Sequence, residues 1–361
     1  MFLAIQSHFR SKEPRPKIAI SHHNADYEWR CRHELYHYLD IKKIGRSWLG
    51  TQLLPPSFRK AFGLLKLNDI DVLLDASGFA FGDLHPESRT TDFAALVQKA
   101  KRLGQIVILM PQAFGPFNNP RLRDAMKQIL DQADLIFARD QDSLGHLQTL
   151  SPENNKLHLS PDFTIGLKGT APKSPPQSEQ TVLIVPNARM LDKTPKDQAS
   201  AYIGTLVRCI NLVRAQNAVP SLLIHDAIED RCLVPKIQEH LQFHIEVIEE
   251  PDPLELKNRI SRCSLLIGSR FHALVGALSQ SIPAIGFGWS HKYERLFEDF
   301  DCVDLAMPVH ATNEELKETI SQLLSPESSR SVGKRLNRSA TRQLAQTEVM
   351  WDKIEQRIAI N

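Results

Sequence analysis

The chain has 361 residues, of which 42% are apolar and 24% charged, and this length suffices for two domains that each bury a core. Its 44 basic and 42 acidic residues leave a formal net charge of +2, which argues against a protein that binds nucleic acid through bulk positive charge. The five cysteines are widely spaced and include no C-x-x-C pair, so we expect a reducing cytoplasm and neither a disulfide framework nor a cysteine-rich zinc site. No apolar run approaches the roughly 18 residues of a membrane span, and Met1–Arg10 lacks the basic start of a secretory signal.

In the first half of the chain, short apolar runs alternate with longer amphipathic stretches. The predicted strands are Lys17–Ile20, Asp71–Asp75, Gln105–Met110 and Leu135–Ala138. The predicted helices are Glu28–Leu39, Arg59–Leu67, Asp92–Arg102, Arg121–Ala133 and Gln141–Leu147. Strands that alternate with helices in this way are typical of βαβ units and a parallel sheet.

A segment rich in Pro, Gly, Ser and Lys follows, and within it Thr170–Gln177 has the composition of a linker. The alternation then resumes, with predicted strands at Thr181–Val185, Ser221–His225, His244–Ile248, Ser264–Gly268 and Pro283–Phe287. The predicted helices are Ala199–Gln216, Asp230–His240, Pro253–Arg262, Phe271–Ser279 and Lys292–Phe300, and the chain is helical from Asn313 onward with a break near Pro326. We therefore expect an α/β fold of two doubly wound Rossmann-like domains, at residues 1–165 and 181–325, joined by a linker at 166–180 and followed by a C-terminal helix at 326–361.

Ligands of such sheets lie beyond the carboxyl ends of the strands, so polar residues directly after an apolar run are candidate site residues. The strongest set follows Ser264–Gly268, where Ser269 is a good N-cap and Arg270, Phe271 and His272 occupy the first turn of a helix. A helix N-terminus attracts anions, and Arg offers a bidentate fork for carboxylate or phosphate. Because His exchanges a proton near neutral pH, the set predicts an anion site with an acid–base group.

Other motifs match known patterns only in part. His33-Glu34-Leu35-Tyr36-His37 has the H-E-x-x-H spacing of zinc proteases on a predicted helix. Asp40 and Lys43 stand where a metzincin would have Gly and His, so we expect a solvated helix face and no metal site. Gly286-Phe-Gly288 fits a dinucleotide fingerprint only until His291 replaces its third glycine. The sequence contains no phosphate-binding G-x-x-x-x-G-K-[ST] loop and no G-x-S-x-G elbow.

Small or polar segments also follow strand ends in the first half. They are Asp75–Asp83, Pro111–Phe117, Ala138–Ser143 and Ser160–Phe163. Each segment alone is typical of a turn, and together they could line one edge of one sheet.

Taken together, these segments resemble the polysaccharide pyruvyl transferase family. The family has a Gly-rich loop after a strand, then a G-Q-[ST]-x-G-P-like segment, R-[DE]-x-x-S, P-D, S-x-R-x-H, G-x-P and a lysine at a helix start. These elements correspond, in order, to Asp75–Gly82, Pro111–Phe117, Arg139–Ser143, Pro161-Asp162, Ser269–His272, Ile282-Pro283 and Lys292. The resemblance spans roughly residues 1 to 300 and implies the two-domain architecture of the GT-B glycosyltransferases.

The chain departs from the family pattern in two places. The Gly-rich loop is reduced to Ala76-Ser77-Gly78, and the usual first strand with its G-N-x-G-D loop is absent. Met1–Phe9 is similar to the helix that should follow that loop. Either the start is misplaced or the chain is truncated, and in the second case part of the acceptor cleft would be missing.

The resemblance implies that pyruvate passes from phosphoenolpyruvate to two hydroxyls of a saccharide, as in cell-surface polysaccharide biosynthesis. We expect phosphoenolpyruvate as co-substrate and no cofactor, and the sequence contains no coherent cluster of metal ligands. On that reading Arg270 holds a donor anion, His272 is the general acid/base, and Ser269 and Lys292 also contact the donor. Arg189, directly after the predicted strand Thr181–Val185, is a further candidate anion clamp. The candidate acceptor-binding residues are Asp75, Ser77, Gln112 and Asp83.

Two other functions fit the same fold class. One is a glycosyltransferase that uses a nucleotide sugar, in which a carboxylate of Glu249–Asp252 would bind ribose. The other is a truncated, non-catalytic relative that only binds saccharide. Fold analogy does not decide among the three, because function belongs to the site.

The C-terminal helix carries a basic stripe. Arg330, Lys334, Arg338 and Arg342 recur every four residues, and no acidic residue lies between Ser328 and Gln346. Such a stripe is either a solvated face or a contact with an anionic membrane surface, where lipid-linked saccharides are assembled. The second option implies an enzyme peripheral to the inner face of a membrane.

Overall fold

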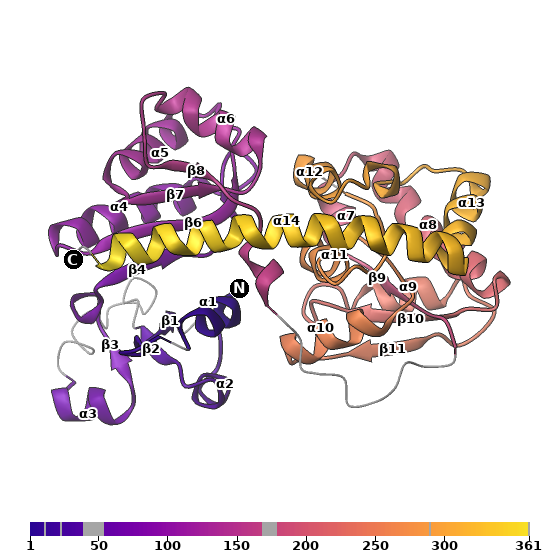
Figure 1. The fold of residues 1–361 in the computed structure, drawn as a ribbon, viewed down its shortest axis with the longest axis horizontal. Helices are drawn as coiled ribbons and strands as arrows, with labels where there is room; N and C mark the ends of the chain where they lie inside the picture. Colours follow the sequence, from indigo (N-terminus) through magenta and orange to yellow (C-terminus); the bar gives the residue numbers. More distant parts are fainter. Residues whose placement is uncertain (11, 22–23, 39–53, 168–178, 289, 360–361) are drawn as a thin grey trace. The chain divides into compact units, whose positions relative to one another are not determined.

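The computed structural model describes residues 1–361 except 11, 22–23, 39–53, 168–178, 289 and 360–361 (Figure 1). Every strand pairing that the described residues make is parallel, and helices alternate with strands, which confirms the α/β class. The chain divides into two compact units, of which one comprises Met1–Leu167 with Glu348–Asn361 and the other Lys168–Thr347. Most of the predicted linker falls at 168–178 and so lies outside the described residues.

The main sheet of the first unit has the strand order β4-β6-β7-β8, and β5 pairs with β6. Its elements are β4 (Val72–Asp75), β5 (Phe79–Phe81), α4 (Glu87–Arg102), β6 (Ile106–Phe114), α5 (Pro120–Gln132), β7 (Leu135–Ala138), α6 (Gln141–Leu150), β8 (Leu157–Leu159) and the 3-10 turn η4 (Phe163–Gly166). Most of these elements match their predicted positions, whereas β5 and β8 are too short to show a period in the sequence.

The strand β6 lies at the centre of two cores because all nine of its residues are buried. Val107 and Leu109 point to one face, where α4 and α5 pack, whereas Ile106, Ile108 and Met110 point to the other. The second face is covered by α1 (Phe2–Phe9) and by the end of the C-terminal helix. Burial on both faces explains why the first five residues of β6, Ile106–Met110, are a continuous apolar run.

A second, three-stranded sheet of the first unit was predicted only in its first strand, Lys17–Ile20. It consists of β1 (Ala19–Ser21), β2 (Tyr36–Tyr38) and β3 (Leu64–Leu65). The predicted helix Glu28–Leu39 is wrong after its first turns, because α2 (Tyr27–Arg32) ends early and Glu34 adopts a φ of 54°. The aromatic residues that follow then pair as β2, for which they are well suited.

This correction also removes the helix on which the H-E-x-x-H motif was placed. His33 caps the end of α2 and His37 lies on β2, so the two imidazoles do not share a helix face. The predicted helix Arg59–Leu67 is likewise replaced, by α3 (Pro56–Ala61), β3 and the 3-10 turn η3 (Leu67–Asp69). The solvated helix face expected for this motif is therefore wrong as to the helix, and the two imidazoles lack the shared face that a zinc protease requires.

The sheet of the second unit has the strand order β11-β10-β9-β12-β13. Its strands are β9 (Thr181–Val185), β10 (Val219–Ile224), β11 (Glu246–Glu249), β12 (Leu265–Gly268) and β13 (Ala284–Gly286). Its helices are α7 (Arg189–Asp192), α8 (Lys196–Ala215), α9 (Leu233–Gln238), α10 (Pro253–Arg262), α11 (Phe271–Leu278), α12 (His291–Asp299) and α13 (Asn313–Leu324), with the 3-10 turn η5 at Val303–Leu305. The first strand is central and the winding reverses between β9 and β12, which is the doubly wound topology expected.

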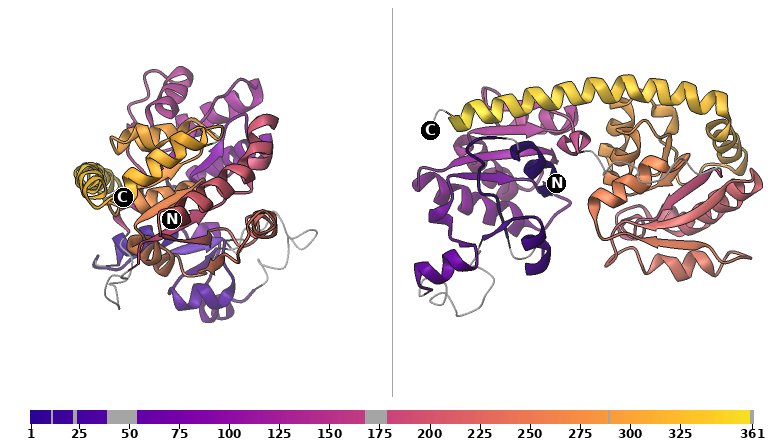
Figure 2. Two further views of the ribbon diagram at one scale, coloured as in Figure 1. Left: turned by 90° about the vertical axis from the view of Figure 1, so that its right-hand side faces the viewer. Right: turned by 60° about the horizontal axis from the view of Figure 1, so that its bottom comes forward.

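The helix α14 (Pro326–Ala359) is one uninterrupted helix of 34 residues (Figure 2). Within the second unit, Arg342 pairs with Asp301 at 3.2 Å and the Ser339 hydroxyl donates to the same carboxylate at 2.7 Å. Within the first unit, Trp351 is buried among core residues and stacks on His8 with ring centroids 4.0 Å apart. The segment predicted at 326–361 therefore contributes to both units. No helix in the part of the chain that the structure describes is long and apolar enough to cross a bilayer.

Candidate active site

Four loops at the carboxyl edge of the second sheet carry polar side chains. Asn187–Arg189 follow β9, Asp226–Asp230 follow β10, Ser269–His272 follow β12, and Lys292 follows β13. These strands are consecutive neighbours in the sheet. Because ligands of doubly wound sheets bind at this edge, the four loops form the candidate site.

Arg270, predicted to hold a donor anion, is engaged by three carboxylates. Its Nε and Nη2 donate to the two oxygens of Asp230 at 2.7 and 2.6 Å, and Nη2 also donates to Glu229 at 3.1 Å. Its Nη1 lies 3.6 Å from Asp226. Burial lowers the pKa of Arg270, but the hydrogen bond and the charge of Asp230 outweigh it, so that the pKa lies above its usual value. Arg270 is therefore held in one orientation as a cation.

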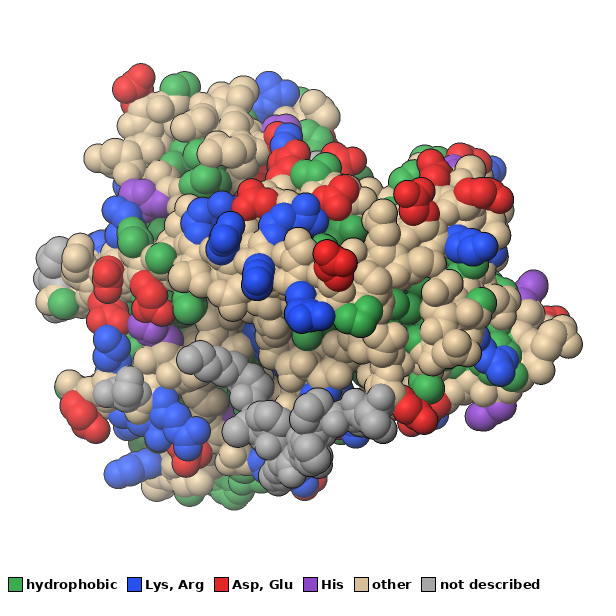
Figure 3. Space-filling model, turned by 45° about the vertical axis from the view of Figure 1, so that its right-hand side comes forward, with side chains coloured by type: hydrophobic (Ala, Val, Ile, Leu, Met, Phe, Trp, Pro, Cys, Tyr) green, Lys and Arg blue, Asp and Glu red, His purple; other side chains and the backbone are tan. Residues whose placement is uncertain are grey.

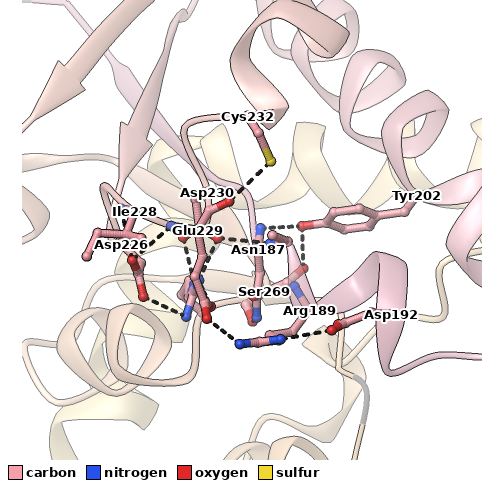
Figure 4. A network of polar contacts seen from close by, with 12 residues as sticks. Asn187, Arg189, Asp192, Tyr202, Asp226, Ile228, Glu229, Asp230, Cys232 and Ser269 are labelled. Carbon is pink, nitrogen blue, oxygen red and sulfur yellow. Dashed lines mark hydrogen bonds and ion pairs between the residues drawn. The ribbon is translucent and has the colours of Figure 1, made fainter.

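Arg189 shares one of these carboxylates. Figure 4 shows Glu229 reaching from the loop after β10 to Arg189, whose other side meets Asp192. Arg189 Nη1 donates to Asp192 at 2.8 Å, and this bond is the main cause of a raised pKa for Arg189. With Arg270 and its partners, two guanidinium groups face four carboxylates, so this network carries a formal charge of −2.

Ser269 lies beneath this network and has no exposed surface. The hydroxyl of Tyr202 donates to Ser269 Oγ at 3.0 Å, while the Asn187 amide and the Tyr293 hydroxyl donate to the Ser269 carbonyl at 2.7 and 2.9 Å. The structure therefore places the Ser269 hydroxyl against Tyr202 in the interior. The predicted N-cap role of Ser269 is wrong by one residue, since the backbone of Arg270 is the N-cap of α11.

His272 and Lys292 lie beside the start of α11. The His272 ring meets the Phe271 ring edge to face with centroids 5.7 Å apart. Lys292 Nζ lies 5.2 Å from the ring centroid of Phe271 and 5.4 Å from that of Tyr293, which is the range of a cation–π contact. The structure thus brings the predicted acid–base group and the predicted lysine to the same aromatic side chain.

In the first unit, three of the predicted acceptor residues form one hydrogen-bonded cluster. Gln112 Nε2 donates to Asp75 at 2.6 Å, and the Ser77 hydroxyl lies 3.0 Å from the same Asp75 oxygen and 2.7 Å from Gln112 Oε1. Gln112 is fully buried, Asp75 half-buried and Ser77 exposed. Burial raises the pKa of Asp75, and the bonds from Gln112 and Ser77 offset part of that rise.

Asp83, the fourth predicted acceptor residue, forms hydrogen bonds with the backbone of a loop. Its carboxylate accepts the backbone N–H groups of Asn118 and Asn119 at 2.8 and 3.2 Å, just before α5 begins. A carboxylate that accepts two N–H groups stiffens the connection between strand and helix. The side chain of Asp83 therefore braces the segment after β6.

Arg139 and Asp162 belong to family motifs, but the sequence assigned them no role. The structure pairs Arg139 Nη1 with Asp162 at 3.3 Å, and both side chains are almost fully buried. The backbone N–H of Arg139 also donates to the carbonyl of Gln112 at 2.9 Å. The backbone of Arg139 therefore joins the strand that carries Gln112, while its side chain forms a buried ion pair, and its position directly after β7 was the signal that could have identified it.

The acids Asp226, Glu229 and Asp230 were also missed as site residues. They follow the apolar run of β10 directly, so the same rule that selected Arg270 would have selected them. Their sequence separation from Arg270 is about forty residues, and charge pairing over that distance requires knowledge of the strand order.

The acids of Glu249–Asp252, which only the alternative glycosyltransferase would use to bind ribose, have partners within the protein. Glu249 pairs with Arg231 at 3.2 Å in an open cavity of about 610 Å³, lined by Arg231, Val234, Pro235, Val247 and Glu249. Glu250 pairs with Arg259 at 3.1 Å, and Asp252 caps α10 by accepting the N–H of Leu254 at 2.8 Å. Each of these carboxylates is therefore used within the second unit.

Comparison with known proteins identifies one family and one fold. A family model for polysaccharide pyruvyl transferase matches residues 1–291. A putative UDP-N-acetylglucosamine 2-epimerase from Listeria monocytogenes superposes with a TM-score of 0.63 at 13% identity, covering 97% of this chain and 92% of that one. S. aureus MnaA in complex with UDP gives 0.64 at 12% identity over 99% and 93% of the two chains. Anabaena HepE in complex with UDP and glucose gives 0.60 at 13% identity over 99% and 95%. At such low identity these structures establish the fold alone.

Proposed function

The chain belongs to the polysaccharide pyruvyl transferase family, and we propose that it transfers the pyruvyl group of phosphoenolpyruvate to two hydroxyls of a saccharide. The observation that carries the proposal is the set of basic side chains at one edge of the second sheet. Arg189, Arg270 and Lys292 offer cations for the phosphate and carboxylate of the donor, and His272 and Lys292 both lie against the Phe271 ring at the start of α11.

The reaction assigns a defined task to His272. Its imidazolium donates a proton to the methylene carbon of phosphoenolpyruvate, which becomes a methyl group, and C2 gains oxocarbenium character. The first saccharide hydroxyl attacks C2 and returns a proton to His272. The second hydroxyl attacks the same carbon as the C–O bond to phosphate breaks, and its proton leaves with the phosphate. The products are the cyclic ketal and inorganic phosphate.

The saccharide is assigned to the first unit. The exposed Ser77 hydroxyl and the half-buried carboxyl of Asp75 present hydrogen-bonding groups of the kind that sugar hydroxyls require, and Gln112 holds both in place. Asp83 and the buried Arg139 support this region from its loops.

The basic stripe of α14 supports an acceptor carried on a lipid at the inner face of a membrane. Arg330, Lys334, Arg338 and Arg342 are all exposed, although Arg342 also pairs with Asp301. Figure 3 shows basic side chains with acidic side chains close beside them, so the face that it draws carries both signs of charge. On this proposal, attraction to anionic lipid comes from the stripe.

The test measures donor binding and turnover separately. Phosphoenolpyruvate at about 100 times its dissociation constant should stabilise the enzyme by roughly 2.7 kcal/mol, visible as a rise in Tm. Lys292→Ala should weaken that rise. His272→Ala should keep it while phosphate release with a saccharide acceptor falls by roughly 10²- to 10⁴-fold.

Two outcomes would overturn the proposal. Full phosphate release by His272→Ala would remove His272 from its role. A rise in Tm with UDP- or GDP-sugars, and none with phosphoenolpyruvate, would replace the proposal with a glycosyltransferase.

A further inference from the structure

Two arginines flank the point at which the second sheet reverses its winding. Arg189 follows β9 and Arg270 follows β12, and these two strands pair directly. In sheets of this order, ligands bind outside the carboxyl ends of the strands at that reversal. Two guanidinium groups at such a place suit a planar carboxylate, which has an oxygen for each.

Glu229 already supplies a carboxylate to both arginines. Its Oε1 accepts a hydrogen bond from Arg189 Nη2, and its Oε2 accepts one from Arg270 Nη2 at 3.1 Å. Each oxygen of the carboxylate thus has a different guanidinium as its donor. The side chain bridges the two loops in the way that the carboxylate of a bound small molecule would (Figure 4).

The neighbouring carboxylate of Asp230 has a different character. Asp230 is completely buried, receives two hydrogen bonds from Arg270 and accepts the backbone N–H of Ala188 at 2.9 Å. The Glu229 side chain is 30% exposed and lies on the loop beside Ile228, which is 95% exposed. Asp230 is therefore a fixed positioning group for Arg270, whereas Glu229 can leave the arginines by rotating into solvent.

We propose that Glu229 occupies the place of the donor carboxylate in the substrate-free enzyme and that the donor binds by displacing it from Arg189 and Arg270. The identity of the donor as phosphoenolpyruvate rests on the proposed function, whereas the displacement applies to any small carboxylate that binds these arginines. The apparent dissociation constant equals the intrinsic one divided by the fraction of molecules in which Glu229 is away from the arginines. If that fraction is about one in ten, the glutamate weakens apparent donor affinity about tenfold.

The test compares carboxylate binding to three variants by calorimetry, with phosphoenolpyruvate and oxalate as probes. Glu229→Gln removes the competing charge and should bind both probes about tenfold more tightly than the wild type. Glu229→Asp keeps the charge but is one methylene too short to bridge, so it should show an intermediate gain. Asp304→Asn removes an equal charge from the exposed ion pair with Arg335, which lies outside the network of Arg189 and Arg270, and should change either affinity by less than about twofold.

The outcomes separate this inference from the proposed function. Equal or weaker binding of both probes to Glu229→Gln, or an equal gain in Asp304→Asn, would overturn the displacement. Wild-type affinity in Glu229→Asp would also overturn it, because the loss of charge alone would then explain the tighter binding of the probes to Glu229→Gln. If oxalate gains while phosphoenolpyruvate binds no variant, the displacement stands and the proposed donor is wrong. Melting curves of the three variants establish that each is folded.

Discussion

The pair of Arg270 and Asp230 offers the sharpest test of how the candidate site is held together. Asp230 is fully buried and gives both oxygens to Arg270 at 2.6 and 2.7 Å, so Asp230→Asn removes a charge and turns an amide N–H₂ toward guanidinium donors. Breaking a buried ion pair costs about 3–5 kcal/mol. Because Arg270 keeps Glu229 at 3.1 Å and Asp226 at 3.6 Å, we expect the lower end, about 3 kcal/mol.

A double-mutant cycle measures this coupling. With a stability change of about 3 kcal/mol, the melting transition of the second unit should fall by about 6 to 12 °C in Asp230→Asn. Arg270→Met should cost a similar amount, because it leaves Asp230 buried and unpaired, and the double variant should cost about 2 kcal/mol less than the two changes together. Asp192→Asn, at an exposed pair, is the matched control and should stay within about 0.5 kcal/mol. A coupling below about 0.5 kcal/mol would refute the view that Asp230 fixes Arg270.

Three further predictions concern other parts of the molecule. Asp75→Asn should gain thermal stability relative to the wild type as pH rises from 4 to 8, because burial raises the pKa of Asp75 and the wild-type fold loses stability as pH rises through that pKa. A difference in Tm between the two proteins that does not vary with pH would contradict this. Trp351→Ala should destabilise the first unit by about 3–5 kcal/mol in calorimetric unfolding, whereas Val349→Ala, at a side chain 55% exposed on the same helix, should change it by less than about 0.5 kcal/mol. The double variant Lys334→Glu/Arg338→Glu should bind phosphatidylserine vesicles at least tenfold more weakly than the wild type, because each basic residue near the surface contributes about 1 kcal/mol. The control Lys236→Glu on α9 should bind as the wild type does, and wild-type binding that does not weaken with salt would contradict a membrane role.

Much of the fold could be predicted from the sequence because its strands are buried on both faces. The runs at β6, β7, β9 and β12 are continuous and apolar, and the amphipathic stretches between them are long enough to show a helical period. In the three-stranded sheet, the predicted strand Lys17–Ile20 overlaps β1, but β2 and β3 could not be predicted in this way. They are three and two residues long, too short for any period, and the aromatic residues of β2 also fit a helical pattern.

Some residues of the candidate site could be predicted from the local sequence, whereas others require knowledge of the strand order. The position of Arg270 and His272 after a strand, and the cluster of Asp75, Ser77 and Gln112, follow from the rule that ligands bind at the carboxyl edge. What surrounds Arg270 could not be read in the same way. Glu229 and Asp230 lie some forty residues away and meet it because β10 and β12 both flank β9, a strand order that short apolar runs do not encode.

That surrounding acidity changes what the arginines can do. On the proposed function, two unpaired guanidinium groups would bind a donor with a phosphate and a carboxylate strongly, but they would also retain the phosphate that the reaction releases. With Asp230 fixed on Arg270, the cation is oriented before the donor arrives, so little ordering remains to be done on binding. With Glu229 able to return to both arginines, the anions compete with a tethered carboxylate at every turnover. The apparent affinity for the donor therefore depends on how much more tightly the arginines bind the donor carboxylate than that of Glu229. Removal of the Glu229 carboxylate should tighten the binding of phosphate as well as that of the donor.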